Sequence, residues 1–182
     1  MLCMAQILLK VLHEKLIIFL RLTKFFNLVH KKKLNLLGFS HESLVVFFNS
    51  IKQPKFRATQ LMKWIHQRGI LDFMEMTDFS LSLRERLANL AVIKPPIVEE
   101  CLLSSGGTQK YLIKLDSGSM IEMVKIPEKK RLTLCISSQV GCALQCTFCA
   151  TGAQGFERNL ESSEIIGQLW LANHYNQPSQ IV

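Results

Sequence analysis

Two adjacent prolines separate a region of helical spacing from a region of strand spacing. Before Pro95 and Pro96, apolar residues recur every three or four positions, which indicates amphipathic helices. After them, apolar and polar residues alternate, and Gly-Gly or Ser-Gly pairs separate the runs, as is typical of antiparallel strands joined by tight turns. The sequence therefore predicts an α/β protein with a helical domain over 34–94, a β-hairpin connector over 95–130 and a further segment over 131–182.

Three helices are expected in the first of these regions. Ser40 is the expected N-cap of the first helix, which Pro54 ends. The second helix ends at Gly69, and the third follows Asp78. The apolar residues expected inside are Leu44, Val45, Phe47, Phe48, Ile51, Phe56, Leu61, Trp64, Ile65, Leu81, Leu83, Leu87 and Leu90.

Composition and charge limit the class of protein. With 48% hydrophobic and 20% charged residues, the chain is globular, and its net charge of +8 fits a nucleic-acid or acidic-membrane partner. Six of these positive charges lie in 1–33, whose longest apolar run, LIIFL, is far shorter than the ~18–20 residues of a membrane span. We expect no stable membrane insertion and a basic apolar extension outside the fold. A membrane-surface helix and a transit peptide remain alternatives.

Four of the six cysteines cluster between positions 135 and 149. Six are too few for a disulfide-stapled scaffold, and their clustering favours thiolates that hold a metal in a reducing, intracellular compartment. Cys142, Cys146 and Cys149 have the spacing C-x3-C-x2-C, which suits three irons of a [4Fe–4S] cluster and leaves one iron open. The alternative is a zinc site, which needs four ligands and would have to include Cys135.

The cysteine loop follows a predicted strand that contains Cys135. It precedes a helix that we expect to be capped by Ser162 or Ser163, with Ile165, Ile166, Leu169 and Trp170 facing inward. Strand, loop and helix in this order form the first βα unit of an α/β barrel or sheet. In such folds the loops at the carboxyl ends of strands carry the chemistry.

Glu122 is an unusual residue for its predicted strand. Alternation places it on one face with Met120, Val124 and Ile126, so it is a carboxylate on an otherwise apolar face. The alternative is an edge-strand acid that turns to water. Cys101, also in a strand, is expected to be a small buried hydrophobe.

Four stretches carry a resemblance to a known family: PKFRATQLMKWIHQRG, FMEMTDFSLSLRERL, LCISSQVGCALQCTFCATGAQGFERNL and SEIIGQLW. Together they resemble the RlmN family of radical S-adenosylmethionine, dual-specificity RNA methyltransferases, from about 34 to 170. The resemblance implies an RNA-holding helical accessory domain followed by the first βα unit of a truncated radical SAM α/β barrel. It also implies methylation of adenine C2 in 23S rRNA and tRNA through a methyl-cysteine intermediate, in the cytoplasm. The implied cofactors are a [4Fe–4S] cluster and S-adenosylmethionine, with a reductant protein such as flavodoxin or ferredoxin.

The resemblance implies roles for individual residues. Cys142, Cys146 and Cys149 match the cluster ligands, Cys135 matches the cysteine that resolves the protein–RNA adduct, and Glu122 matches the proton acceptor. Basic residues that would contact RNA phosphates are Arg57, Lys63, Lys129, Lys130 and Arg131.

Other family motifs have no match here. The Gly-Glu motif and later positions that bind S-adenosylmethionine are absent, as is the C-terminal methyl-carrying cysteine, so no cofactor-binding residue is identified. We therefore expect a truncated chain that is inactive alone or needs a second polypeptide. The alternative is a non-catalytic RNA-binding fragment whose cysteines bind zinc or nothing.

Overall fold

The structure of the chain is a computed structural model that describes residues 33–129, 131–144, 153, 155–175 and 180–181. Residues 35–182 form one compact unit. The expectations for residues 1–32 lie outside the described part. Among the helices of that part, none has the length and apolar character needed to cross a membrane.

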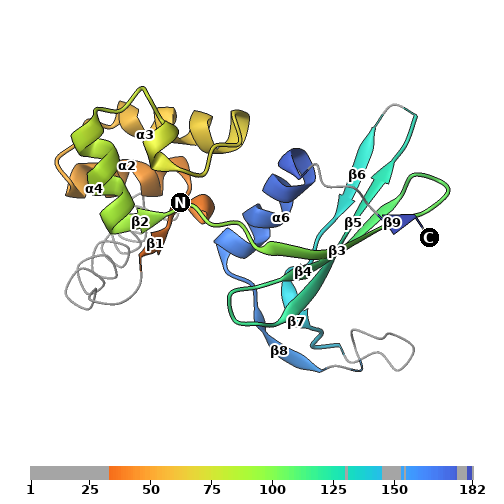
Figure 1. Cartoon of the computed structure of the whole chain (residues 1–182). Helices are drawn as coiled ribbons and strands as arrows, with labels where there is room; N and C mark the ends of the chain where they lie inside the picture. The colour runs from red at the N-terminus through yellow and green to blue at the C-terminus, as the bar shows by residue number, and fades with distance from the viewer. Residues whose placement is uncertain (1–32, 130, 145–152, 154, 176–179, 182) are drawn as a thin grey trace, which may run out of the picture. The chain divides into compact units, whose positions relative to one another are not determined.

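The three expected helices are confirmed (Figure 1). They are α2 (His41–Ser50), α3 (Phe56–Met62), which continues as the π-helical segment η2 (Lys63–Gln67), and α4 (Leu81–Leu90). The hydroxyl of Ser40 accepts a hydrogen bond from the Ser43 N–H at 3.2 Å, so Ser40 is the N-cap of α2 as predicted. Ser80, two residues later than the expected start, caps α4.

The interior of the helical part is formed by one face of each helix and by the two 3₁₀ turns η1 (Leu36–Gly38) and η3 (Phe73–Glu75). Fully buried side chains are Leu36, Leu37, Leu44, Phe47, Phe48, Ile51, Leu61, Ile65, Met76, Phe79 and Leu87. Phe56 and Leu81 were expected inside, but they are 52% and 53% exposed. Each is the first residue of its helix, and the buried face begins only at Ala58 in α3 and at Leu83 in α4.

The two ends of the helical part meet in a short ladder of β1 (Leu34–Asn35) and β2 (Ala91–Val92). The side chain of Asn35 donates to the Lys94 carbonyl at 2.7 Å and accepts from the Lys94 N–H at 3.0 Å. This amide therefore fixes the chain just before the two prolines at which the strands begin.

A five-stranded sheet comes next along the chain. Its strands are β3 (Ile97–Leu103), β4 (Gln109–Lys114), β5 (Met120–Pro127), β6 (Leu132–Cys135) and β9 (Gln180–Ile181). Their order is β6-β5-β4-β3-β9, and all neighbours are antiparallel except β3 and β9. The predicted hairpins are confirmed, and β6 joins the same sheet as the strands of the expected connector.

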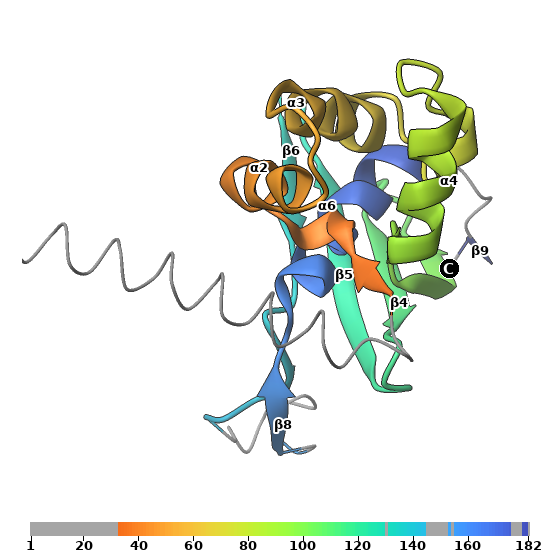
Figure 2. The same ribbon diagram turned by 90° about the vertical axis from the view of Figure 1, so that its left-hand side faces the viewer.

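Helix α6 (Ser162–His174) covers one face of this sheet, as both views of the fold show (Figures 1 and 2). We call this the inner face. Its core contains Cys101, Tyr111, Ile113, Leu115, Ile121 and Met123 together with Leu171 and Ala172 of α6. The opposite, outer face carries the alternate residues of each strand.

The start and the phase of α6 differ from the prediction. Glu161, not Ser162 or Ser163, is the N-cap, because its side chain and that of Glu164 form a capping box. The buried residues of α6 are Gly167, Gln168, Leu171 and Ala172, whereas Leu169, expected inside, is 40% exposed. The helix contacts both the sheet and η1, so the spacing of its large apolar residues alone did not predict its buried face.

Close backbone approach joins α6 to the helical part. A Cβ atom on Gly167 would lie 2.3 Å from Pro96 Cδ, and one on Gly38 would lie 2.3 Å from the Ser163 nitrogen. Between these residues and the end of the helix, the indole N–H of Trp170 donates to the Ile65 carbonyl at 2.9 Å. Only glycine allows α6 to lie this close.

We predict that Gly167→Ala destabilises the protein by about 1–3 kcal/mol, measured by urea denaturation. Alanine favours a helix by about 1 kcal/mol over glycine, but the added methyl group would clash with a rigid proline ring. Gly106→Ala is the control, because its Cβ would have no neighbour closer than 3.9 Å and should change stability little. A Gly167→Ala protein at least as stable as the wild type would contradict this packing.

Candidate active site and cysteine loop

Glu122 and Cys135, the two residues expected to act on substrate, lie on the outer face of the sheet. Cys135 of β6 pairs with Val124 of β5, and Glu122 lies two residues before Val124. Diagonal neighbours of this kind are roughly 7–8 Å apart in antiparallel sheets. The register therefore brings the carboxylate and the thiol together from two different strands.

Glu122 lies on the face of β5 that it was expected to share with Met120, Val124 and Ile126, and this face is partly open to solvent. Its carboxylate forms an ion pair with Lys110, with 2.7 Å between Oε1 and Nζ, and its side chain is 51% exposed. The covered face of β5 is the other one, which carries Ile121 and Met123. Glu122 is not on an edge strand, since β5 lies between β4 and β6.

Cys135 and Cys101 differ in accessibility. Cys135 is an exposed free thiol at the end of β6, the edge strand of the sheet. Cys101 is 6% exposed and packs in the core, as predicted. Of these two thiols, only that of Cys135 is accessible to a large substrate.

A buried glutamine fixes the chain directly after Cys135. Gln168 of α6 is completely buried, and its amide accepts from the Ser137 N–H and donates to the Ser137 carbonyl, both at 2.9 Å. The Ser137 hydroxyl in turn donates to the Glu122 carbonyl at 2.8 Å. One side chain of α6 therefore positions the backbone next to both candidate residues.

The cysteine loop is closed at its base by a second short ladder. Strands β7 (Gln139–Gly141) and β8 (Phe156–Asn159) pair antiparallel, and the Cys142 N–H donates to the Gly155 carbonyl at 3.0 Å. Gly141 has φ +69°, and a Cβ there would lie 1.7 Å from the Gly155 oxygen, so only glycine fits. The expected direct order of strand, loop and helix is thus corrected, because β8 stands between the loop and α6.

An ion pair ties β8 to the start of α6. The guanidinium of Arg158 donates to both carboxylate oxygens of Glu164, at 2.7 and 2.8 Å. This hydrogen bonding lowers the pKa of Glu164 and raises that of Arg158. Arg158 also donates to the Ser117 hydroxyl at 3.1 Å, in the turn between β4 and β5. The far end of the cysteine loop is therefore held by charge-assisted bonds.

The metal ligands expected from the sequence are only partly within the described residues. Cys142 is a free, half-buried thiol at the first position after β7, whereas Cys146 and Cys149 lie outside the described part. Within that part, no group of three His, Cys, Asp or Glu side chains could hold a metal. A loop pinned at both ends and containing three thiols is chemically suited to an iron–sulfur cluster.

The basic residues expected on RNA phosphates have different environments. Arg57 is held internally by hydrogen bonds to Gln60 and to the Asp78 carbonyl. Lys63 and Lys129 are exposed, and Arg131 is exposed but paired with Glu128. Lys130 lies outside the described residues. Lys63 and Lys129 are thus the described residues of this set with accessible charges.

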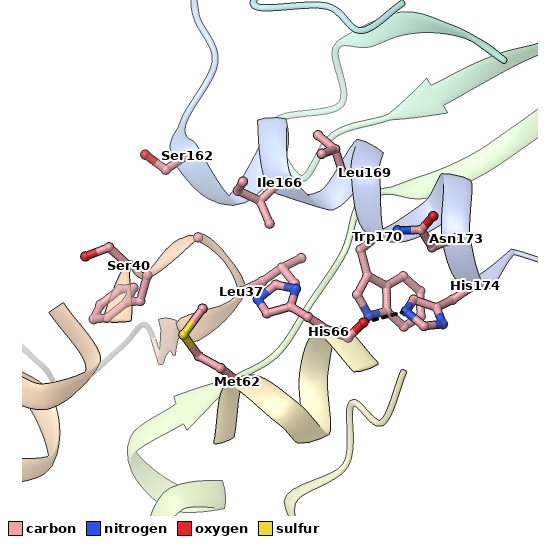
Figure 3. A pocket seen from close by; sticks show the side chains of 12 residues that line it. Leu37, Ser40, Met62, His66, Ser162, Ile166, Leu169, Trp170, Asn173 and His174 are labelled. Atoms are coloured by element: carbon pink, nitrogen blue, oxygen red, sulfur yellow. Dashed lines mark hydrogen bonds between the residues drawn. The ribbon is translucent and has the colours of Figure 1, made fainter. Parts of the chain in front are cut away.

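A hollow of about 540 Å³ lies between α6 and the helical part (Figure 3). Ile166 and Trp170 line it from α6, and Met62 and His66 line it from the opposite side. Burial, with His174 nearby, lowers the pKa of His66. None of Glu122, Cys135 and Cys142 lines this hollow.

Sequence reasoning missed Gln168, Lys110 and Arg158. A glutamine in an amphipathic helix is usually solvent-exposed, and a lysine in a strand usually has no specific partner, so neither residue type carried a signal. For Arg158 the sequence did offer a hint. Glu161 and Glu164 follow it with the spacing of a capping box, which indicates a helix start with acidic side chains close to this arginine.

We predict that the Arg158–Glu164 pair makes the free energy of unfolding decrease as the pH falls into the acid range. Because the folded-state pKa of Glu164 is lowered, its contribution is present above its unfolded value, near 4.5, and is lost as the pH falls through the folded value. Glu164→Gln should lower the free energy of unfolding at pH 7 by about 2 kcal/mol and flatten its decrease in acid. Chemical denaturation at several pH values measures both effects.

Glu157→Gln is the matched control for this experiment. Glu157 approaches the same arginine only to 4.0 Å and is 54% exposed, so its pair contributes little. Equal effects of the two substitutions at pH 7 would contradict the role given to Glu164.

We predict that Gln168→Leu removes the two hydrogen bonds that the Ser137 backbone forms with this side chain. Leucine has nearly the same volume but no hydrogen-bonding group, so the partly buried N–H and carbonyl would lose their partners at a cost of about 1–3 kcal/mol. Amide hydrogen exchange of Ser137 should accelerate more than that of the core strand β4. Unchanged protection of the Ser137 amide would contradict this assignment.

Three comparisons relate this geometry to known proteins. Residues 34–93 match the family model described as the ribosomal RNA large subunit methyltransferase N-terminal domain. The chain is 53% identical to the dual-specificity RNA methyltransferase RlmN of Marinomonas sp. (strain MWYL1) over 143 residues, which is 78% of this chain and 38% of that protein. It is 51% identical to the RlmN of Saccharophagus degradans over 146 residues, 80% of this chain and 37% of that protein.

A solved structure is also similar. A radical SAM methyltransferase from Sphaerobacter thermophilus superposes with a TM-score of 0.70 at 32% identity, over 76% of this chain and 41% of that one. The α/β fold class is thereby confirmed. The chain spans about two fifths of the length of the curated relatives it matches. Over about four fifths of its own length, the chain is similar to these RlmN proteins.

Proposed function

We propose that this chain provides the RNA-holding domain and the cysteine-loop segment of a radical SAM methyltransferase that modifies adenine C2 in 23S rRNA and tRNA. The observation that carries the proposal is the register of β5 and β6, which places Glu122 beside Cys135 on the exposed outer face, next to the base of the cysteine loop. A substrate large enough to cover a sheet face can reach both groups at once. The relatives from Marinomonas and Saccharophagus carry RlmN names, which supports this reaction.

Cys142, Cys146 and Cys149 are the residues that would hold a [4Fe–4S] cluster. When bound with S-adenosylmethionine, and reduced by a protein such as flavodoxin or ferredoxin, this cluster would supply radical chemistry. The thiols of these three cysteines fit it, because soft thiolates are the usual ligands of iron–sulfur clusters. The closed base of the loop between Gly141 and Gly155 supports a preorganised site.

The chain's own residues would complete the reaction. The carboxylate of Glu122 accepts the proton from adenine C2, and the ion pair with Lys110 keeps this carboxylate on the outer face. The thiolate of Cys135 would attack the sulfur that links the protein to the RNA, so that an S–S bond forms and the S–CH2 bond breaks. The released carbon keeps the electron pair and takes up a proton, which leaves a methyl group on the base. The Gln168–Ser137 bonds fix the backbone that carries both groups.

The proposed setting is the cytoplasm, where thiols stay reduced and ribosomal and transfer RNA are present. The net charge of +8 supports a polyanionic partner. Lys63 and Lys129 are accessible for phosphate contacts.

We predict that anaerobic reconstitution of the purified chain with ferrous iron and sulfide loads about four irons and four sulfides. Cys142→Ala should lower the iron content sharply and remove the charge-transfer absorbance, because it deletes one of three ligands. Iron and acid-labile sulfide analyses measure the loading.

Cys135→Ser is the matched control, since the proposal gives Cys135 a role in turnover and none in metal binding. It should load iron as the wild type does. Loss of iron in Cys135→Ser, or equimolar zinc and no iron in the wild type, would instead indicate a four-thiol zinc site and contradict the proposal.

A further inference from the structure

The helical part presents one large aromatic side chain at the start of α3. Phe56 is 52% exposed, although the helix contributes Ala58 and Leu61 to the core. Burying an aromatic ring of this size normally stabilises a fold. An exposed phenylalanine in a well-packed helical domain therefore leaves a large apolar surface available to a partner.

An arginine supports this ring from the protein side. The guanidinium carbon of Arg57 lies 5.0 Å from the centroid of Phe56 and 5.4 Å from that of the buried Phe79. Two hydrogen bonds fix the same guanidinium, to Gln60 at 2.8 Å and to the Asp78 carbonyl at 2.7 Å. The ring of Phe56 is thus in contact with a fixed group. The Phe56 side chain would therefore lose little additional freedom when a planar partner binds to it.

The segment that carries the ring is cationic. Residues 51–68 contain five Lys or Arg side chains and no Asp or Glu. Thr59 and Lys63 are exposed at helical spacing from Phe56, three and seven residues after it. Lys55 directly precedes the helix and Lys52 lies in the turn before it, and both are exposed. We call Lys52, Lys55, Phe56 and Lys63 the basic aromatic face.

We propose that the basic aromatic face binds single-stranded RNA, with an unpaired base stacked on Phe56 and flanking phosphates on Lys52 and Lys55. The proposal rests on the proposed RNA-modifying function and names the surface that would hold the substrate. Stacking on an aromatic ring strengthens the binding of an unpaired base and tolerates any base, while lysines supply the phosphate contacts. A protein partner fits less well, because the exposed residues close to Phe56 in the sequence are lysines and a threonine rather than further large apolar side chains.

The test uses the full 182-residue chain and two probes, a fluorescein-labelled oligoadenylate and a blunt RNA duplex of equal length. Phe56→Leu keeps an apolar side chain but removes the aromatic plane. It is expected to weaken binding of the single strand about tenfold in fluorescence anisotropy and to change duplex binding little, because paired bases cannot stack on the ring. Lys55→Gln should reduce the salt dependence of single-strand binding by about 0.7 in the log–log slope, the value of one phosphate contact.

Leu81→Ala is the matched control. Leu81 is also the first residue of its helix and is 53% exposed, but it lies in α4 and is not part of the basic aromatic face. It should leave RNA binding unchanged. Thermal melting followed by circular dichroism checks that each variant is folded.

The outcomes separate this inference from the proposed function. A wild-type chain that binds neither probe would contradict the RNA-directed function and the basic aromatic face together. Equal affinities of the wild type and Phe56→Leu for the single strand would contradict the basic aromatic face alone, and would leave Phe56 to a protein contact.

Discussion

Close contact between α6 and its surroundings is the constraint on which the rest of this fold depends. The helix covers the inner face of the sheet, and it also approaches the helical part so closely that Gly38 and Gly167 have no room for a side chain. Its polar contacts are as specific as its apolar ones, because the buried amide of Gln168 pairs with both backbone groups of Ser137. A helix that moved by about one ångström would strain or break these hydrogen bonds inside the protein.

This packing has consequences for the candidate site. The backbone at Ser137 is fixed on one side by α6 and on the other by its bond to the Glu122 carbonyl, so β5, β6 and the start of β7 are held together. The cysteine loop leaves from β7 and returns through β8, whose Arg158 is bound to Glu164 in the first turn of α6. One helix therefore holds both ends of the loop that carries three of the six cysteines.

The charges of the described surface have two different uses. Some are committed to local pairs, such as Lys110 with Glu122 and Arg57 with its two hydrogen-bond acceptors. Others, among them Lys55 and Lys63, are exposed on a segment that has no acidic residue. Counting charges along the sequence does not separate these uses, because a committed arginine and an exposed lysine contribute equally to the net charge.

Local patterns predicted much of the fold. Ser40 as an N-cap, the three helices, the antiparallel hairpins and the burial of Cys101 follow from interactions between residues close in sequence or from alternation. Predictions failed where a residue or a face could be covered by either of two neighbouring elements. The buried side of α6 and the exposure of Phe56 depend on which neighbour covers which face, and periodicity cannot supply that information.

By itself, the sequence predicted the α/β class, indicated a resemblance to the RlmN family and suggested the candidate residues, because motif spacing and resemblance are properties of the chain alone. Only the tertiary structure decided that Glu122 and Cys135 are diagonal neighbours on an exposed face. It also decided that Lys110 pairs with Glu122 and that Gln168 binds the Ser137 backbone. The physical reason is that strand register and helix packing arise from contacts between distant segments. Those contacts form when apolar faces are buried together and the buried polar groups find partners.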